Sequence, residues 1–135
     1  MVAVNFSGWW TGKKSREEQK AYVFDKIRSR IKDQTIRKVG KRVIKVEEPL
    51  QLYWGMRQKW CEKISDAICT RVLKVAFDVD GPVIIYDSDG WIAPGFRLHG
   101  KDLEDFATRD GFESVESFLK AFELGVYNVY RWEVI

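Results

Sequence analysis

The chain has 135 residues, of which 45% are hydrophobic and 32% are charged, and its formal net charge is +3. This length suffices for one domain with its own core, and the composition excludes a disordered chain. No apolar run approaches the ~20 residues of a membrane span, and the first residues do not resemble a signal peptide. Two cysteines, Cys61 and Cys69, exclude a disulfide framework. We therefore expect a single domain over 1–135, located in the cytoplasm and not associated with a membrane.

The expected elements begin with a short strand over 2–6 and a helix over about 15–31. Ser15 and Glu18 form a capping-box pattern at the start of this helix. Four apolar residues recur at helical spacing and predict its buried face: Val23, Phe24, Ile27 and Ile31.

Strand patterns dominate the rest of the chain. Segments rich in β-branched or aromatic residues predict strands over 41–46, 49–54, 71–79, 82–86, 91–93 and about 126–134. Alternation places one set of residues on a buried face of the third segment: Leu73, Val75, Phe77 and Val79. The sequence Asp-Ser-Asp-Gly at 87–90 predicts a hairpin turn, and short helices are expected over about 101–110 and 114–123. This order predicts an α+β fold, a small and mostly antiparallel β-barrel with helices at its rim.

Charge is distributed unevenly along the chain. Residues 1–74 carry 18 Lys and Arg against 8 Asp and Glu, whereas residues 75–135 carry 5 against 12. Nine of the basic residues lie between Lys26 and Lys45, where Asp33 is the only acidic residue. Such a cluster favours a polyanionic partner, although a solvated helix face and loop give the same pattern.

Several motifs, in order along the chain, resemble the ASCH domain, a relative of the PUA domain. Residues 32–38, Lys-Asp-Gln-Thr-Ile-Arg-Lys, resemble its Lys-x-x-Thr-Ile-Arg signature. Residues 50–64 are similar to the Leu-Gln-Leu-Tyr-x-Gly-Met-Arg segment of short ASCH proteins from bacteria and their phages. Residues 106–122 resemble the Asp-Gly-Phe helix pair, and 129–134 resemble the last strand. The segment 9–22 is longer than the usual link between first strand and first helix.

The resemblance implies a curved PUA-like barrel beside a cleft that binds RNA or nucleotides, without a cofactor. Some relatives are amidohydrolases that remove the acetyl group from 4-acetylcytidine, and at least one other is described as a ribonuclease. Residue by residue, the implied catalytic groups are Lys32, Thr35 and Asp110. The amidohydrolases carry glutamate where this chain has Asp110.

The chemistry of these residues can be considered separately from the resemblance. Hydrolysis of an exocyclic amide needs a nucleophile, a base and an acid for the leaving amine. Thr35 supplies a hydroxyl, and Lys32 can deprotonate it only if burial or a cation such as Arg37 lowers its pKa. Asp110 would protonate the leaving nitrogen, and Arg37 would hold a phosphate or an acyl oxygen. Alternatively, Thr35 bonds a loop backbone, Lys32 is solvated and Asp110 ends a helix.

Six further residues are expected to contact a substrate or nucleic acid: Arg37, Lys38, Lys41, Arg42, Tyr53 and Arg57. Rings and cations interleave around Tyr53, as on single-stranded nucleic-acid surfaces, although the pattern favours Trp54 as core and Arg57 as surface. The function classes that remain are an enzyme acting on a modified nucleoside, a non-catalytic RNA-binding module, a ribonuclease acting on single-stranded RNA, and an inhibitor of a host protein.

Other candidate sites have weaker support. The cysteines lack zinc-finger spacing and His99 is the only histidine, so no metal site is expected. If exposed, Trp9 and Trp10 would serve as a stacking platform or a partner contact, and packing in the core or in a dimer is the favoured interpretation.

Overall fold

The structure, a computed structural model, describes residues 1–90 and 95–135. Its strands are β1 (Val2–Phe6), β2 (Gln34–Lys38), β3 (Pro49–Trp54), β4 (Glu62–Asp78), β5 (Gly81–Asp87), β6 (Phe96–Arg97) and β7 (Gly125–Val134). Its helices are the single-turn η1 (Trp9–Thr11), α1 (Arg16–Arg28), α2 (Gly100–Arg109) and α3 (Val115–Lys120). None of the helices in the described ranges has the length and apolarity needed to cross a membrane.

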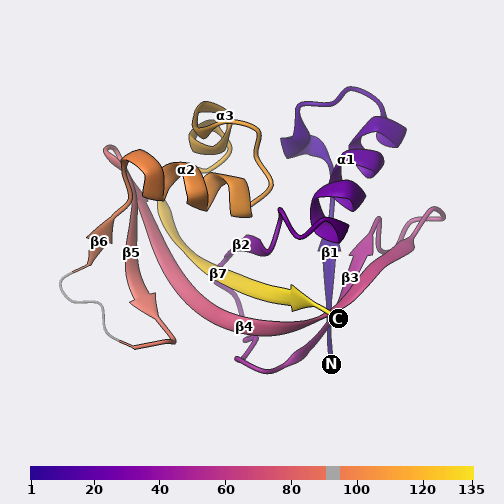
Figure 1. Ribbon diagram of the computed structural model, residues 1–135, viewed down its shortest axis with the longest axis horizontal. Coiled ribbons are helices and arrows are strands. Elements are labelled where there is room, and N and C mark those ends of the chain that lie inside the picture. The colour runs from indigo at the N-terminus through magenta and orange to yellow at the C-terminus, as the bar shows by residue number, and fades with distance from the viewer. Residues whose placement is uncertain (91–94) are drawn as a thin grey trace.

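All of these strands join in one sheet of hydrogen-bonded order β1-β3-β4-β5-β6, and β7 pairs with both β4 and β2. Only the β1–β3 pair is parallel among the pairs that the structure describes. The 17-residue β4 pairs with β3 near its start and with β5 near its end, while β7 follows it along the other side. Figure 1 shows β4 and β7 bent together, so the sheet curls into a half-barrel. The prediction of a small, mostly antiparallel, barrel-like α+β fold is therefore confirmed, with the barrel only half closed.

The half-barrel opens between β1 and β2, which do not pair with each other. Arg37 of β2 donates a hydrogen bond to the carbonyl oxygen of Asn5 at 2.5 Å, and Arg42 donates one to that of Ala3 at 3.3 Å. Alternate carbonyl groups of β1 are therefore bound by side chains where another strand would bind them.

The hydrophobic core of the described residues has two clusters. One lies among α1, β1 and β3 and includes Ile27 and Leu52, and the other lies between β4, β7 and the helices α2 and α3 and includes Phe118 and Val129. Trp10 packs against both clusters, so the segment that carries η1 covers the boundary between them.

The first helix begins as predicted and ends early. The hydroxyl of Ser15 accepts a hydrogen bond from the backbone of Glu18, as a capping box requires. The helix ends at Arg28 because Arg30 has a φ of 69°, which no α-helix accommodates. The predicted burial of Ile31 is consequently wrong, since this residue is 42% exposed. The other three apolar residues of the predicted face are buried: Val23, Phe24 and Ile27.

One strand prediction was wrong and another was wrong in part. Residues 41–46 form no strand, because no described strand pairs with them and β propensity stabilises a strand only beside a neighbour. The strand predicted over 71–79 is the second half of β4, which starts at Glu62, and Val79 lies beyond its end with 86% exposure. The predicted strand over 91–93 lies outside the described residues. The helix predicted over 114–123 is shorter, ending at Lys120.

Candidate functional site

Lys32, Thr35 and Asp110 line one cavity of about 110 Å³. Lys32 lies in the link between α1 and β2, Thr35 lies in β2, and Asp110 is the C-cap of α2. Their exposed fractions are 3%, 6% and 4%. The structure thus brings together three groups that are up to 78 positions apart in the chain, and it contradicts the interpretation of Lys32 as a solvated residue.

Local backbone geometry fixes the position of Lys32. After Arg30 reverses the chain, the backbone N–H of Lys32 donates to the carbonyl oxygen of Lys26 at 2.8 Å. Gly111 provides room on the opposite side. A Cβ at this position would lie 2.9 Å from Cδ of Lys32 and 3.0 Å from Cη2 of Trp10. The glycine after α2 therefore leaves the space that the side chains of Lys32 and Trp10 occupy.

The Lys32 side chain is buried in a partly polar environment. Its Nζ donates to the carbonyl oxygens of Gln34 at 2.7 Å and Asp110 at 2.5 Å, and lies 3.9 Å from Oδ1 of Asp110. The pKa of Lys32 is lowered to about 8, chiefly by burial; the Asp110 carboxyl opposes the shift and Arg37 adds to it. Three rings have their centroids 5.0–5.8 Å from Nζ: Trp10, Phe6 and Trp132.

Asp110 shows the complementary effect. Burial raises the pKa of its carboxyl group, whereas Lys32 and Arg37 lower it. Its Oδ1 atom is buried and has no hydrogen-bond partner among the described residues. An unpaired buried acceptor costs about 1–3 kcal/mol, so a ligand that donates a hydrogen bond here would be favoured.

The hydroxyl of Thr35 is held by Arg37. Nε of Arg37 donates to Oγ1 of Thr35 at 2.9 Å, which leaves the hydroxyl proton free for another acceptor. Within the part of the chain that the structure describes, no direct hydrogen bond joins Oγ1 to Nζ of Lys32. Proton transfer between them therefore requires a closer approach than the free protein shows.

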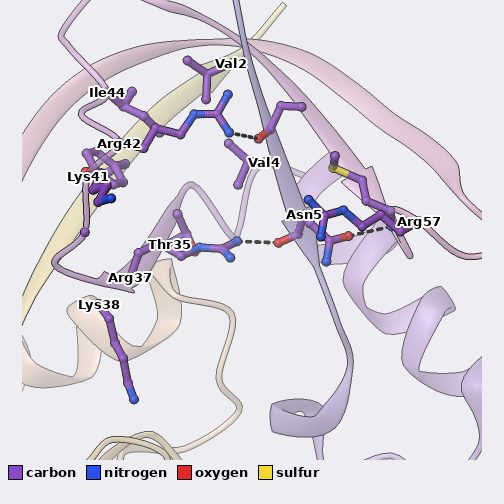
Figure 2. Close-up of a pocket in the computed structure, with 14 residues that line it drawn as sticks. Val2, Val4, Asn5, Thr35, Arg37, Lys38, Lys41, Arg42, Ile44 and Arg57 are labelled. Atoms are coloured by element: carbon purple, nitrogen blue, oxygen red, sulfur yellow. Dashed lines mark hydrogen bonds between the residues drawn. The ribbon is translucent and has the colours of Figure 1, made fainter.

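A second cavity, of about 460 Å³, adjoins the first at Asn5, Thr35 and Arg37, which line both (Figure 2). None of its lining residues is acidic, and five are basic: Arg37, Lys38, Lys41, Arg42 and Arg57. Five of the six predicted binding residues thus gather here. Tyr53 does not, because it lies half-buried on β3, outside both cavities, with its hydroxyl 3.5 Å from Oε1 of Gln51.

Residues that the sequence did not identify as site residues also line the smaller cavity. Trp10 packs against Tyr22 and Phe112, in agreement with the interpretation of this residue as packing. Trp9 is 68% exposed and lines the cavity, so it is not a core residue of this chain. The adjacent pair of tryptophans was the sequence signal for these residues, but hydrophobic periodicity did not predict that one would be exposed and the other packed.

Other sequence interpretations concern metals and core residues. Within the described residues, no group of three or more His, Cys, Asp or Glu side chains could hold a metal ion. Cys69 is buried and Cys61 is exposed, and both are free thiols. Trp54 is a core residue and Arg57 lies on the surface, as predicted.

No protein-family model, curated protein or solved structure matches this chain. The function has to be inferred from the geometry of the two cavities and from the motifs in the sequence.

Proposed function

We propose that the protein hydrolyses the exocyclic amide of 4-acetylcytidine-type substrates. The observation that supports this most strongly is the shared cavity of Lys32, Thr35 and Asp110, because these groups suffice for acyl transfer. The resemblance of residues 32–38 and 106–122 to ASCH domains favours the same reaction and a PUA-like classification of the half-barrel.

In the proposed reaction, Oγ1 of Thr35 attacks the acyl carbon and its proton passes to neutral Lys32. The bond between the acyl carbon and the exocyclic nitrogen then breaks, and protonated Asp110 gives its proton to the leaving amine. Water hydrolyses the resulting threonine ester and gives a proton to the Asp110 carboxylate, while Lys32 returns its proton to Oγ1. One amide and one water become one carboxylic acid and one amine, and the three side chains recover their initial states.

The electrostatics of the cavity support these roles. The first step needs a neutral Lys32 and a protonated Asp110, and burial shifts the pKa values of both groups toward those states. The guanidinium of Arg37 lies against Oγ1 of Thr35 and would stabilise negative charge that develops as the proton leaves.

The two cavities suit different parts of such a substrate. A volume of about 110 Å³ is small compared with the roughly 300–1,000 Å³ of typical ligand pockets, so it suits the acyl group. The adjoining cavity of about 460 Å³ is large enough for a nucleoside, and its cations would attract phosphates.

The second candidate is an RNA-binding module without acyl transfer, or a ribonuclease acting on single-stranded RNA. The observation that favours it is the set of five basic residues, without an acidic one, around the larger cavity. A free nucleoside does not need so strong a positive potential.

Chromatography of 4-acetylcytidine incubated with the protein tests the proposal directly. We expect release of cytidine by the wild type and none by Thr35→Ala, because the nucleophile is lost. Asp110→Asn should slow turnover by about 10²–10⁴-fold, as expected for loss of a general acid. Thr108→Ala is the matched control, since Thr108 is exposed on α2 and lines neither cavity. Wild-type protein that turns over no acylated cytidine but still binds or cleaves RNA would refute the amidohydrolase and support the second candidate.

A further inference from the structure

Trp9 is an exposed aromatic residue at the smaller cavity. It belongs to η1, lines the cavity together with Lys32, Thr35 and Asp110, and is nevertheless 68% exposed. In the described part of the chain no aromatic ring packs on Trp9 and no cation lies over it. Its indole is therefore available to a ligand at the entrance to the cavity.

The turn that carries Trp9 is fixed to the rest of the protein. The hydroxyl of Thr11 donates to the carbonyl oxygen of Gly8 at 2.6 Å and accepts from the backbone of Lys13 at 3.2 Å. A Cβ on Gly8 would lie 2.4 Å from Cβ of Gln19, so only glycine lets η1 lie this close to α1. The backbone at position 9 is consequently held against α1, beside the smaller cavity.

Among the described residues, the other exposed tryptophan is Trp60, and its surroundings are different. The guanidinium of Arg16 lies 3.9 Å from the ring centroid of Trp60, so one face of that ring is already occupied. Trp60 lines neither of the two cavities.

We infer that Trp9 is a stacking platform for a flat heterocyclic ring, and that it restricts the site to acyl groups attached to such a ring. This inference rests on the proposed function, because it takes the acyl group to enter the smaller cavity. A group that fills about 110 Å³ leaves the ring to which it is attached outside, beside the exposed indole. Stacking of a base on an aromatic side chain is worth about 1–3 kcal/mol, which corresponds to about 5- to 150-fold in Kd. An aliphatic amide of equal acyl size gains nothing from Trp9.

Binding is measured first, independently of turnover. In a Thr35→Ala background, 4-acetylcytidine and cytidine should quench tryptophan fluorescence through contact with Trp9. Replacing Trp9 by Phe should remove the quenching, whereas Trp60→Phe, the matched control, should retain it. Trp9→Ala should raise the Kd of 4-acetylcytidine by about 5- to 150-fold, and Trp9→Phe should raise it less because a ring is retained.

Turnover supplies the second measurement. Trp9→Ala should raise KM for 4-acetylcytidine and leave kcat nearly unchanged, since the indole does not touch the reacting atoms. N-Butylacetamide should be a poor substrate of both proteins.

The two proposals fail separately. If Trp9→Ala has the same Kd and KM for 4-acetylcytidine as the wild type, Trp9 is not a stacking platform. Turnover by the wild type would still support the amidohydrolase proposal. Quenching that depends on Trp9, without turnover by the wild type, would uphold the platform and refute the amidohydrolase. Absence of binding of either nucleoside to the wild type would overturn the platform.

Discussion

Lys32 is the residue whose environment differs most from that of an ordinary lysine. An ammonium group 3% exposed among three rings is costly, and its two backbone acceptors and the Asp110 carboxyl offset that cost only in part. The pKa of about 8 is the result. A general base is most useful when its pKa lies near the working pH, so this burial has a direct bearing on the proposed reaction.

The pKa of Lys32 predicts how the rate depends on pH. At pH 7 about one tenth of Lys32 would be neutral, and at pH 8 about half, so kcat/KM should rise by up to about 25-fold between pH 6.5 and 8.5 while Asp110 stays protonated. Deprotonation of Asp110 would oppose this rise at higher pH. The measurement is kcat/KM for 4-acetylcytidine from pH 6 to 9.5. Lys32→Arg is the control, because arginine stays protonated and should be inactive throughout. Turnover by Lys32→Arg that matches the wild type at any pH in this range would rule out Lys32 as the base.

At the scale of elements, Gly111 links the end of α2 to the cavity. Its φ of 97° favours glycine, and a Cβ there would press on Lys32 and Trp10. Gly111→Ala should therefore lower the free energy of unfolding by about 1–3 kcal/mol and also reduce turnover by displacing Lys32. Denaturant unfolding and the rate on 4-acetylcytidine measure the two effects.

Gly81, the first residue of β5, is a suitable control. Its φ of 110° is similar to that of Gly111, but a Cβ there would meet no atom within 4 Å. Gly81→Ala should reproduce the backbone strain without the contact, and it should leave turnover unchanged. Equal losses of stability and activity in the two variants would show that Gly111 does not act through Lys32.

The elements also show what could be predicted from the sequence. A capping pattern identified the start of α1, and strand-like composition identified β1, β3 and most of β7, because these signals are local. The strand predicted over 41–46 was wrong because a strand needs a partner, and pairing partners are not local. The exposure of Trp9 and the burial of Lys32 were equally beyond periodicity, since each depends on where the segment 9–22 and Gly111 lie in space. The motif resemblance selected Lys32, Thr35 and Asp110 without showing that they meet.

On the scale of the whole molecule, the uneven charge of the chain becomes a localised surface. The larger cavity lies between β1 and β2 at the opening of the half-barrel, and its charged lining residues all come from the basic first half of the chain. Lys38, Lys41 and Arg42 are exposed there (Figure 2). Such a concentration of one sign of charge raises the local concentration of polyanions and makes their binding depend on salt.

This surface predicts the salt dependence of RNA binding. If phosphates lie along the larger cavity, log K for single-stranded RNA should fall linearly with log[salt], by roughly 0.7 per phosphate contact. Replacing Lys38, Lys41 and Arg42 together by Ala removes three cations and should reduce the slope by about 2. The matched control replaces Lys63, Lys101 and Lys120 by Ala, three lysines outside both cavities that pair with acidic neighbours. This control variant loses the same three positive charges as the first, and it should retain most of the slope of log K against log[salt]. If both triple variants reduce the slope by the same amount, RNA binding depends on net charge alone, and the phosphates do not bind along the larger cavity.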